Sequence, residues 1–263
     1  MDNINLLKQW PDLFGDRSVL IRIDPGSGAG HHKFVSTAGN QSKFGIPRED
    51  IPELIALCKT LNIQVLGLHA HSGSGILTTD LWESTALFLT DFLNVFPHVR
   101  IINLGGGLGV AEKPGQIELN LQQLDQALLI IKQRFAAIEF WLEPGRYFVS
   151  DAGVLLTQVT QCKQKNKANF VGVNTGMNSL IRPALYGAYH EIVNLTKFDA
   201  QKTEVTQIVG PICESSDTLG YDRLLPTTQE NDVILIANVG AYGYSMSSHY
   251  NLRAPAQELI LQS

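Results

Sequence analysis

One repeating pattern constrains the fold most strongly: in the first half of the chain, short apolar runs are each followed by a polar or glycine-rich loop and a longer amphipathic stretch. The apolar runs predict strands at 18–24, 64–71, 99–105 and 138–144. Apolar residues recurring every three or four positions predict helices near 50–62, 79–96 and 119–135. The spacing of the strands is comparable with the roughly 30 residues per unit of a (β/α)8 barrel. We therefore expect parallel strands joined by helices.

The pattern changes after about residue 150. Shorter β-rich runs separated by turn residues follow, at 154–162, 170–174, 203–210 and 232–240. Such runs are typical of a mainly antiparallel sheet. We therefore predict two domains: residues 1–150, the C-terminal half of a (β/α)8 barrel, and residues 151–263, a β-rich C-terminal domain with substrate and dimer contacts.

The number of strand–helix units is a problem for a closed barrel. Four units are visible, whereas a (β/α)8 barrel needs eight. The expected fold class is therefore α/β, with a partial TIM barrel (about its second half) followed by a mainly antiparallel β domain. An open half barrel would expose both sheet edges and an apolar interior. Either the sheet is open by design, another chain supplies the remainder, or the sequence is a piece of a longer protein.

Composition excludes several classes of partner and compartment. The 263 residues carry 20 Lys and Arg against 25 Asp and Glu, which gives a net charge of -5 and disfavours nucleic acid. The sequence contains neither a signal-peptide pattern nor an apolar run of membrane-spanning length. Cys58, Cys162 and Cys213 are odd in number and widely spaced, so they form neither a disulfide framework nor a metal motif. We expect a cytoplasmic protein with no membrane partner.

Polar residues cluster where the apolar strands end, which is where α/β folds assemble their active sites. In Gly67–Gly75, the side chains of His69 and His71 share one face of a strand. Three interpretations remain open. The two histidines are polar residues at a strand end, a His-x-His metal pair, or a site where His71 stacks on an aromatic cofactor while Ser74 binds a phosphate.

Two further motifs follow strands in the first half. The glycines at 105–107 allow backbone N–H groups to approach an anion, although a tight turn is an equal alternative. Glu143 ends an apolar strand and Arg146 lies three residues later. The carboxylate can keep a pyridine-type nitrogen protonated, while the guanidinium can pair with a phosphate or a substrate carboxylate. The alternative is a buried ion pair between the two.

The β-rich half contains three motifs of its own. Cys213 and Glu214 lie on one turn, where a buried inert cysteine is the default interpretation. Arg182 and Tyr186 are four residues apart and could share one face of a short helix, or lie on a solvated surface. Tyr242 follows an apolar strand and could enter a site or contact the core.

Taken in order, these motifs resemble the fold-type III pyridoxal-phosphate decarboxylases, most closely the branch that acts on meso-diaminopimelate. The specific stretches are His-x-Gly-Ser, Gly-Gly-Gly, Glu-Pro-Gly-Arg, Arg-Pro-x-Leu-Tyr, Gly-Pro-x-Cys-Glu-Ser and Gly-Ala-Tyr. The resemblance also includes residues 22–26, 31–33, 42–46 and 250–251 and a strand at 256–261, so it covers essentially the whole chain.

The resemblance implies a function and a role for each matching residue. The function is the decarboxylation of meso-2,6-diaminopimelate to L-lysine and CO2, with pyridoxal 5'-phosphate as cofactor. The residues implied at the cofactor are His71, Ser74, Gly105, Gly106, Gly107, Glu143, Arg146 and Tyr242. Those implied at the amino-acid substrate are Arg146, Arg182, Tyr186 and Glu214, and the implied catalytic residues are Glu143 and Cys213. Cys213 and Glu214 would enter the neighbouring subunit's site, which makes a homodimer with shared active sites the expected assembly.

One expected residue has no match. The lysine that attaches the cofactor in this family lies upstream of His-x-Gly-Ser, and the chain begins too late to contain it. Lys167 precedes Ala168 and Asn169 as in the family's lysine motif, but it follows a polar, cationic stretch that predicts a hairpin rather than a buried nucleophile. We therefore expect a central-to-C-terminal piece that cannot link the cofactor covalently by itself. The alternatives are a non-catalytic relative with a binding or regulatory role and a metal-dependent barrel hydrolase using His69, His71 and Glu143.

Overall fold

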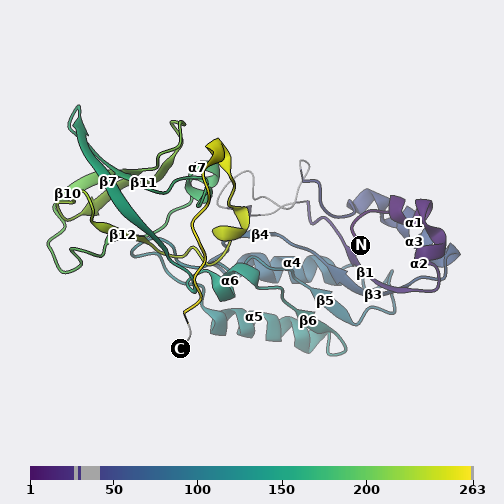
Figure 1. Cartoon of the computed structure of the whole chain (residues 1–263). Helices are drawn as coiled ribbons and strands as arrows, with labels where there is room; N and C mark the ends of the chain where they lie inside the picture. Colours follow the sequence, from purple (N-terminus) through teal and green to yellow (C-terminus); the bar gives the residue numbers. More distant parts are fainter. Residues whose placement is uncertain (27–28, 31–41, 262–263) are drawn as a thin grey trace. The chain divides into compact units, whose positions relative to one another are not determined.

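The computed structural model describes residues 1–26, 29–30 and 42–261, and its backbone divides into two compact units (Figure 1). The first unit comprises residues 1–111 and 117–147, and the second comprises 112–116 and 148–263. The assignment of 1–150 and 151–263 as domains stays a prediction. Residues 31–33, which contribute to the family resemblance, lie outside the described residues.

The first unit is built on a parallel four-stranded sheet with the order β1-β3-β5-β6. Its strands are β1 (Ser18–Arg22), β3 (Gln64–His69), β5 (Ile101–Asn103) and β6 (Glu139–Trp141). Its helices are α1 (Asn5–Gln9), α2 (Pro11–Phe14), α3 (Ile51–Thr60), α4 (Asp80–Thr90) and α5 (Leu121–Arg134), and the 3-10 helix η2 (Arg48–Asp50) precedes α3. A short parallel pair joins β2 (Ala29–Gly30) to β4 (Gly73–Ser74). All four predicted strands and all three predicted helices are present, and the partial (β/α)8 barrel is confirmed.

The two faces of this sheet differ in character. Ile21, Leu68 and Ile102 are fully buried and form part of the core that packs with the helices. Because side chains alternate along a strand, their neighbours point to the opposite face. That face carries Leu20, which is half buried, and Trp141, which is exposed. The expected exposure of an apolar interior is therefore present at Trp141.

The second unit contains a six-stranded sheet with the order β11-β10-β8-β7-β12-β9. Its strands are β7 (Leu155–Lys165), β8 (Ala168–Val173), β9 (Ile192–Asn194), β10 (Glu204–Val209), β11 (Thr218–Leu225) and β12 (Val233–Ile236). Its short helices are α7 (Arg182–Tyr186), η3 (Tyr244–Met246) and η4 (Tyr250–Leu252), and α6 (Gly145–Val149) spans the division between the units. Only the β8–β10 pair is parallel, which confirms the mainly antiparallel domain.

The expected strand at 256–261 is wrong. The segment has no regular secondary structure, and its apolar residues Leu259, Ile260 and Leu261 are 84–93% exposed. Apolar sequence alone does not make a strand, because a strand also needs a hydrogen-bonding partner. The segment is attached instead near its start, where the amide of Ala256 donates to Ser179 Oγ at 3.0 Å.

Candidate active site

Three polar side chains lie at one level where neighbouring parallel strands end. In the sheet register, Arg22 of β1 pairs with His69 of β3, and His69 pairs with Asn103 of β5. Residues paired across parallel strands point to the same face, so the three share the open face of the sheet. The carboxyl end of the strands is where the sequence places the site.

Asn103 connects the acid of the site to the glycine loop. Its Nδ2 donates to Glu143 Oε1 at 2.7 Å, and its Oδ1 accepts the amide of Gly105 at 2.9 Å. The side chain is buried. Sequence reasoning gave Asn103 no role, although its place between a strand and three glycines was a usable signal. The amide therefore fixes the Glu143 carboxylate relative to the loop.

His69 lies beside the same carboxylate. Its Nε2 is 3.7 Å from Glu143 Oε2 and, among the described residues, has no hydrogen-bond partner. Burial lowers the pKa of His69 to about 4, against the opposing effect of Glu143 and with a smaller lowering effect from Arg22. The Glu143 side chain is 56% exposed. At neutral pH the site thus contains a neutral imidazole beside a carboxylate that solvent can reach.

The glycine loop orients His71. The amide of Gly106 donates to His71 Nδ1 at 3.0 Å. An Nδ1 that accepts a hydrogen bond carries no proton, so the neutral ring has its proton on Nε2. Burial, followed by the charge of Arg22, lowers the pKa of His71. The ring is therefore neutral and held by the backbone of the loop.

Close packing explains why this loop consists of glycines. A Cβ on Gly106 would lie 2.5 Å from the carbonyl oxygen of Glu143, and one on Gly107 would clash with the carbonyl oxygen of Gly73. Gly105 and Gly107 also have φ values of +71° and +103°, which disfavour residues with a Cβ. His71, the glycine loop and Glu143 therefore come together, as the sequence predicts.

The expected role of the loop amides changes in one respect. The amides of Gly105 and Gly106 donate to Asn103 and His71, so they are not free for a phosphate. Among the described residues, the amide of Gly107 has no acceptor. The cofactor roles expected of Gly105, Gly106 and Gly107 stay predictions, and in this structure the amides of Gly105 and Gly106 fix Asn103 and His71.

The other residues expected in the first unit occupy different positions. Ser74 is half buried in the short strand β4. Arg146 is buried in α6. No cluster of three or more metal-ligating side chains occurs in the described part of the chain. The Nδ1 lone pair of His71 already accepts the Gly106 amide, so it cannot also bind a metal ion. The geometry therefore does not favour the hydrolase alternative.

Arg182 is buried within the second unit, not on a solvated surface. It begins α7 and is 3% exposed. Its Nη2 donates to Glu112 Oε1 at 3.2 Å, and its Nη1 lies 3.1 Å from His190 Nε2. Tyr186 ends the same short helix, as expected, and is half buried. Sequence reasoning missed Glu112, which is 70 residues from Arg182, and His190, which is eight residues away but beyond the end of α7.

Cys213 and Glu214 lie on an exposed turn, so the buried-cysteine interpretation is wrong. The Glu214 carboxylate accepts a short hydrogen bond from the Tyr250 hydroxyl. The turn is anchored by the buried Asp217, whose Oδ2 accepts the Ile212 amide at 2.7 Å and whose Oδ1 accepts the Met177 amide at 2.6 Å. The carboxylate of Asp217 thus presents Cys213 and Glu214 to solvent.

Tyr242 is 52% exposed and has a φ of +62°, so it is not an aromatic core contact.

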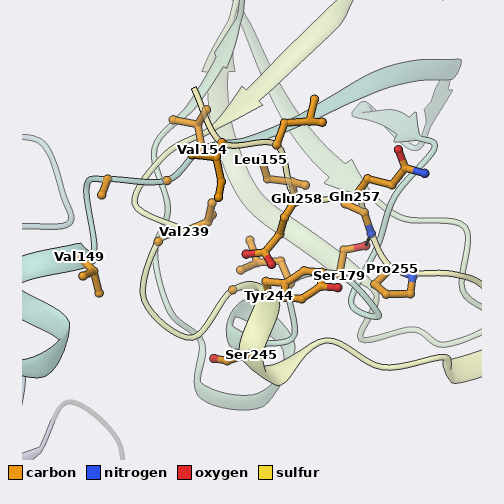
Figure 2. A pocket seen from close by; sticks show the side chains of 18 of the residues that line it. Val149, Val154, Leu155, Ser179, Val239, Tyr244, Ser245, Pro255, Gln257 and Glu258 are labelled. Atoms are coloured by element: carbon orange, nitrogen blue, oxygen red, sulfur yellow. Dashed lines mark hydrogen bonds between the residues drawn. The ribbon is translucent and has the colours of Figure 1, made fainter. Parts of the chain in front are cut away.

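A cavity of about 590 Å³ lies in the second unit, and Figure 2 shows Ser179, Tyr244, Pro255 and Glu258 around it. None of the predicted site residues lines this cavity. The sequence predictions therefore did not identify the lining of this cavity.

Comparison with known proteins identifies the family. The family described as the pyridoxal-dependent decarboxylase C-terminal sheet domain matches residues 29–240. The chain belongs to the pyridoxal-dependent decarboxylases. No helix in the described part of this decarboxylase-family chain is long and apolar enough to cross a membrane.

The individual relatives of the chain that we compared carry the same name, diaminopimelate decarboxylase. It is 36% identical over 254 residues to diaminopimelate decarboxylase of Methanothermobacter thermautotrophicus, covering 92% of this chain and 59% of that protein. The enzyme of Aquifex aeolicus is 35% identical over 250 residues, with coverage of 93% and 59%. The chain thus spans about 59% of the length of these two relatives.

Solved structures show the same relationship. The diaminopimelate decarboxylase of Helicobacter pylori complexed with L-lysine has a TM-score of 0.84 and 32% identity, covering 95% of this chain and 64% of that one. The enzyme of M. jannaschii in complex with L-lysine also has a TM-score of 0.84 and 32% identity, with coverage of 97% and 62%. The pyridoxal-dependent decarboxylase fold is therefore shared across nearly the whole chain.

Proposed function

We propose that this chain provides cofactor- and substrate-binding parts of a decarboxylase that converts meso-2,6-diaminopimelate to L-lysine and CO2. The observation that carries the proposal is the connected group of His71, Gly106, Asn103 and Glu143 on the open face of the sheet. The names of the relatives support the choice of reaction. When bound, pyridoxal 5'-phosphate supplies a protonated pyridine ring that accepts the electron pair left by the departing carboxylate.

The first unit fits this cofactor chemically. Close packing of Gly106 and Gly107 against the backbone of Glu143 and Gly73 fixes the shape of the loop. The neutral ring of His71, fixed through Nδ1, provides a flat surface for stacking. Ser74 and the amide of Gly107 provide donors for the phosphate. These residues would hold the cofactor without a change in the loop.

Glu143 would hold the proton on the ring nitrogen. A carboxylate stabilises a neighbouring pyridinium by its charge, and Asn103 keeps one of its oxygens in place. Since His69 is neutral, it places no competing positive charge beside Glu143. His69 thus leaves the Glu143 carboxylate available for the cofactor.

The second unit would bind the far end of the substrate. Arg182 offers a guanidinium group, which matches a carboxylate geometrically, and Tyr186 adds a hydroxyl. Arg146, which lies in the first unit, stays an expected substrate residue. Glu214 offers a carboxylate for an ammonium group. A substrate with a second carboxylate and a second amine matches this set, which is why we favour a diamino dicarboxylic acid.

We further propose that the protein is a cytoplasmic homodimer with shared active sites. The exposed turn carrying Cys213 and Glu214 supports a role for these residues in the neighbouring subunit's site. Three free cysteines support a reducing compartment.

Binding of pyridoxal 5'-phosphate to the chain tests the cofactor part of the proposal. Glu143→Gln should weaken the affinity about tenfold, because an amide cannot stabilise a pyridinium as a charge does. Glu118→Gln is the matched control, since Glu118 lies on the exposed surface of the same unit. Cofactor absorbance and fluorescence quenching measure both affinities, and equal values for the two variants would contradict the proposal.

Assays of CO2 release from meso-diaminopimelate separate the alternatives. Cofactor binding with no CO2 release, measured on a dimer to which a segment carrying the family's lysine has been added, would favour a non-catalytic binding role. Stoichiometric zinc with no absorbance from the cofactor would favour the metal-dependent hydrolase.

A further inference from the structure

A buried polar group in the second unit surrounds the residue that we propose to bind the substrate carboxylate. His190 is fully buried and Arg182 is 3% exposed. His190 Nε2 lies 3.1 Å from Arg182 Nη1, and Glu112 Oε1 lies 3.2 Å from Arg182 Nη2. The guanidinium is therefore held at both of its terminal nitrogens.

The hydrogen bonds determine the protonation state of His190. Its Nδ1 lies 2.8 Å from the carbonyl oxygen of Ala237, which can only accept, so Nδ1 carries the proton. Nε2 then has a lone pair, and the Arg182 guanidinium, which can only donate, supplies the hydrogen. Burial lowers the pKa of His190 to about 4, so the ring is neutral at physiological pH. The carbonyl of Ala237 thus sets the tautomer that Arg182 requires.

The energetic consequence concerns orientation. A buried guanidinium with an unpaired donor is costly, so the His190 acceptor favours one position of Nη1. The contacts with His190 and Glu112 use two N–H donors, and a guanidinium has others for a carboxylate. We propose that His190 is a positioning residue that holds Arg182 in the orientation needed to bind the distal carboxylate of the substrate. This inference rests on the proposed function.

Two substitutions separate positioning from simple filling of space. In His190→Gln, the side-chain amide oxygen can replace Nε2 as the acceptor for Arg182. In His190→Asn, the shorter amide can replace Nδ1 as the donor to Ala237 but cannot reach Arg182. Both variants are polar, uncharged and smaller than histidine. A difference between them therefore reports the contact with Arg182.

Calorimetry with two ligands measures the effect on carboxylate binding. L-Lysine and 1,5-diaminopentane differ only in one carboxylate, and both are titrated into the chain with pyridoxal 5'-phosphate added. We expect His190→Asn to weaken L-lysine binding about tenfold, because a hydrogen bond to a charged group is lost. Binding of 1,5-diaminopentane should not change, and His190→Gln should stay within about twofold of the wild type for both ligands.

If both variants lose the same affinity for L-lysine, the inference is overturned while the proposed function stands. The same holds if His190→Asn loses the same affinity for both ligands. A wild-type chain that does not prefer L-lysine would overturn the proposed carboxylate site, and the inference with it. The two failures are thus distinguishable.

A second measurement needs no substitution. In 15N spectra of the wild-type chain at pH 7, His190 should show a protonated Nδ1 and an unprotonated Nε2. The Nε2 signal should shift when L-lysine saturates the chain, and 1,5-diaminopentane should not shift it. A proton on Nε2, or a cationic ring, would overturn the inference even if His190→Asn fails to fold.

Discussion

Asn103 shows how one side chain can decide the geometry of a site. It is neither an acid nor a base, yet its amide links the Glu143 carboxylate to the glycine loop. Sequence reasoning identified Glu143 and the glycines because their residue types suggest chemistry. The position of Asn103 before the glycines could have indicated the contact with Gly105, but the contact with Glu143, 40 residues away in the sequence, leaves no local pattern.

Gly106 allows a test of the packing argument at the same scale. In Gly106→Ala, the new Cβ would lie 2.5 Å from the backbone oxygen of Glu143, which cannot move freely. We expect a loss of about 1–3 kcal/mol in the free energy of unfolding. Gly145→Ala is the matched control, because nothing lies within 4 Å of its added Cβ. Urea unfolding measures the free energy of unfolding of both variants. Similar values would show that the loop backbone shifts to accept the extra Cβ.

Secondary structure elements were predictable where burial follows a regular period. Ile21, Leu68 and Ile102 mark the centres of three strands whose buried faces pack with the helices, and their apolar character was a sufficient signal. The strands β9 and β11 were missed. β9 has three residues, and β11 contains Gly220 and Asp222, which are disfavoured in strands; Asp222 has a φ of +52°. Their stability comes from pairing with neighbours, which sequence alone does not show.

The hairpin between β7 and β8 confirms the interpretation of Lys167 and provides a prediction for an element. Asn166 and Lys167 have φ values of +50° and +67°, and Lys167 is exposed. Lysine is disfavoured in this left-handed region, whereas glycine is not. Lys167→Gly should therefore raise the free energy of unfolding by about 0.5–1 kcal/mol.

Urea unfolding checks this value, with Lys165→Gly in β7 as the matched control. That variant should be no more stable than the wild type, because Lys165 is the last residue of β7 and glycine is disfavoured in strands. A destabilised Lys167→Gly variant would argue against relief of strain at the turn.

At the scale of the whole molecule, each compact unit contains a histidine that burial keeps neutral at physiological pH. His69 is half buried and His190 is fully buried. His69 belongs to the first unit and His190 to the second, and burial lowers the pKa of each to about 4. In the unfolded chain both titrate near 6.5. Between these pH values the unfolded state binds more protons than the folded state, so stability falls as the pH falls from 6.5 towards 4.

The expected loss is about 1.4 kcal/mol per pH unit for each histidine. Urea unfolding at pH 7 and pH 5 measures this loss. In His190→Gln, the free energy of unfolding of the second unit should differ less between pH 7 and pH 5 than in the wild type. If the variant and the wild type lose equal stability, His190 is not the source of the acid sensitivity.

The alternation of side chains along the parallel strands separates the residues that pack the core from the residues that form the site. Ile21, Leu68 and Ile102 point into the core, while Arg22, His69 and Asn103, each one position later, point to the open face. Substitutions at the second set leave the buried contacts of the first set intact. Evolution could therefore exchange the polar layer for another chemistry without losing the scaffold, and an engineer who redesigns the site can do the same.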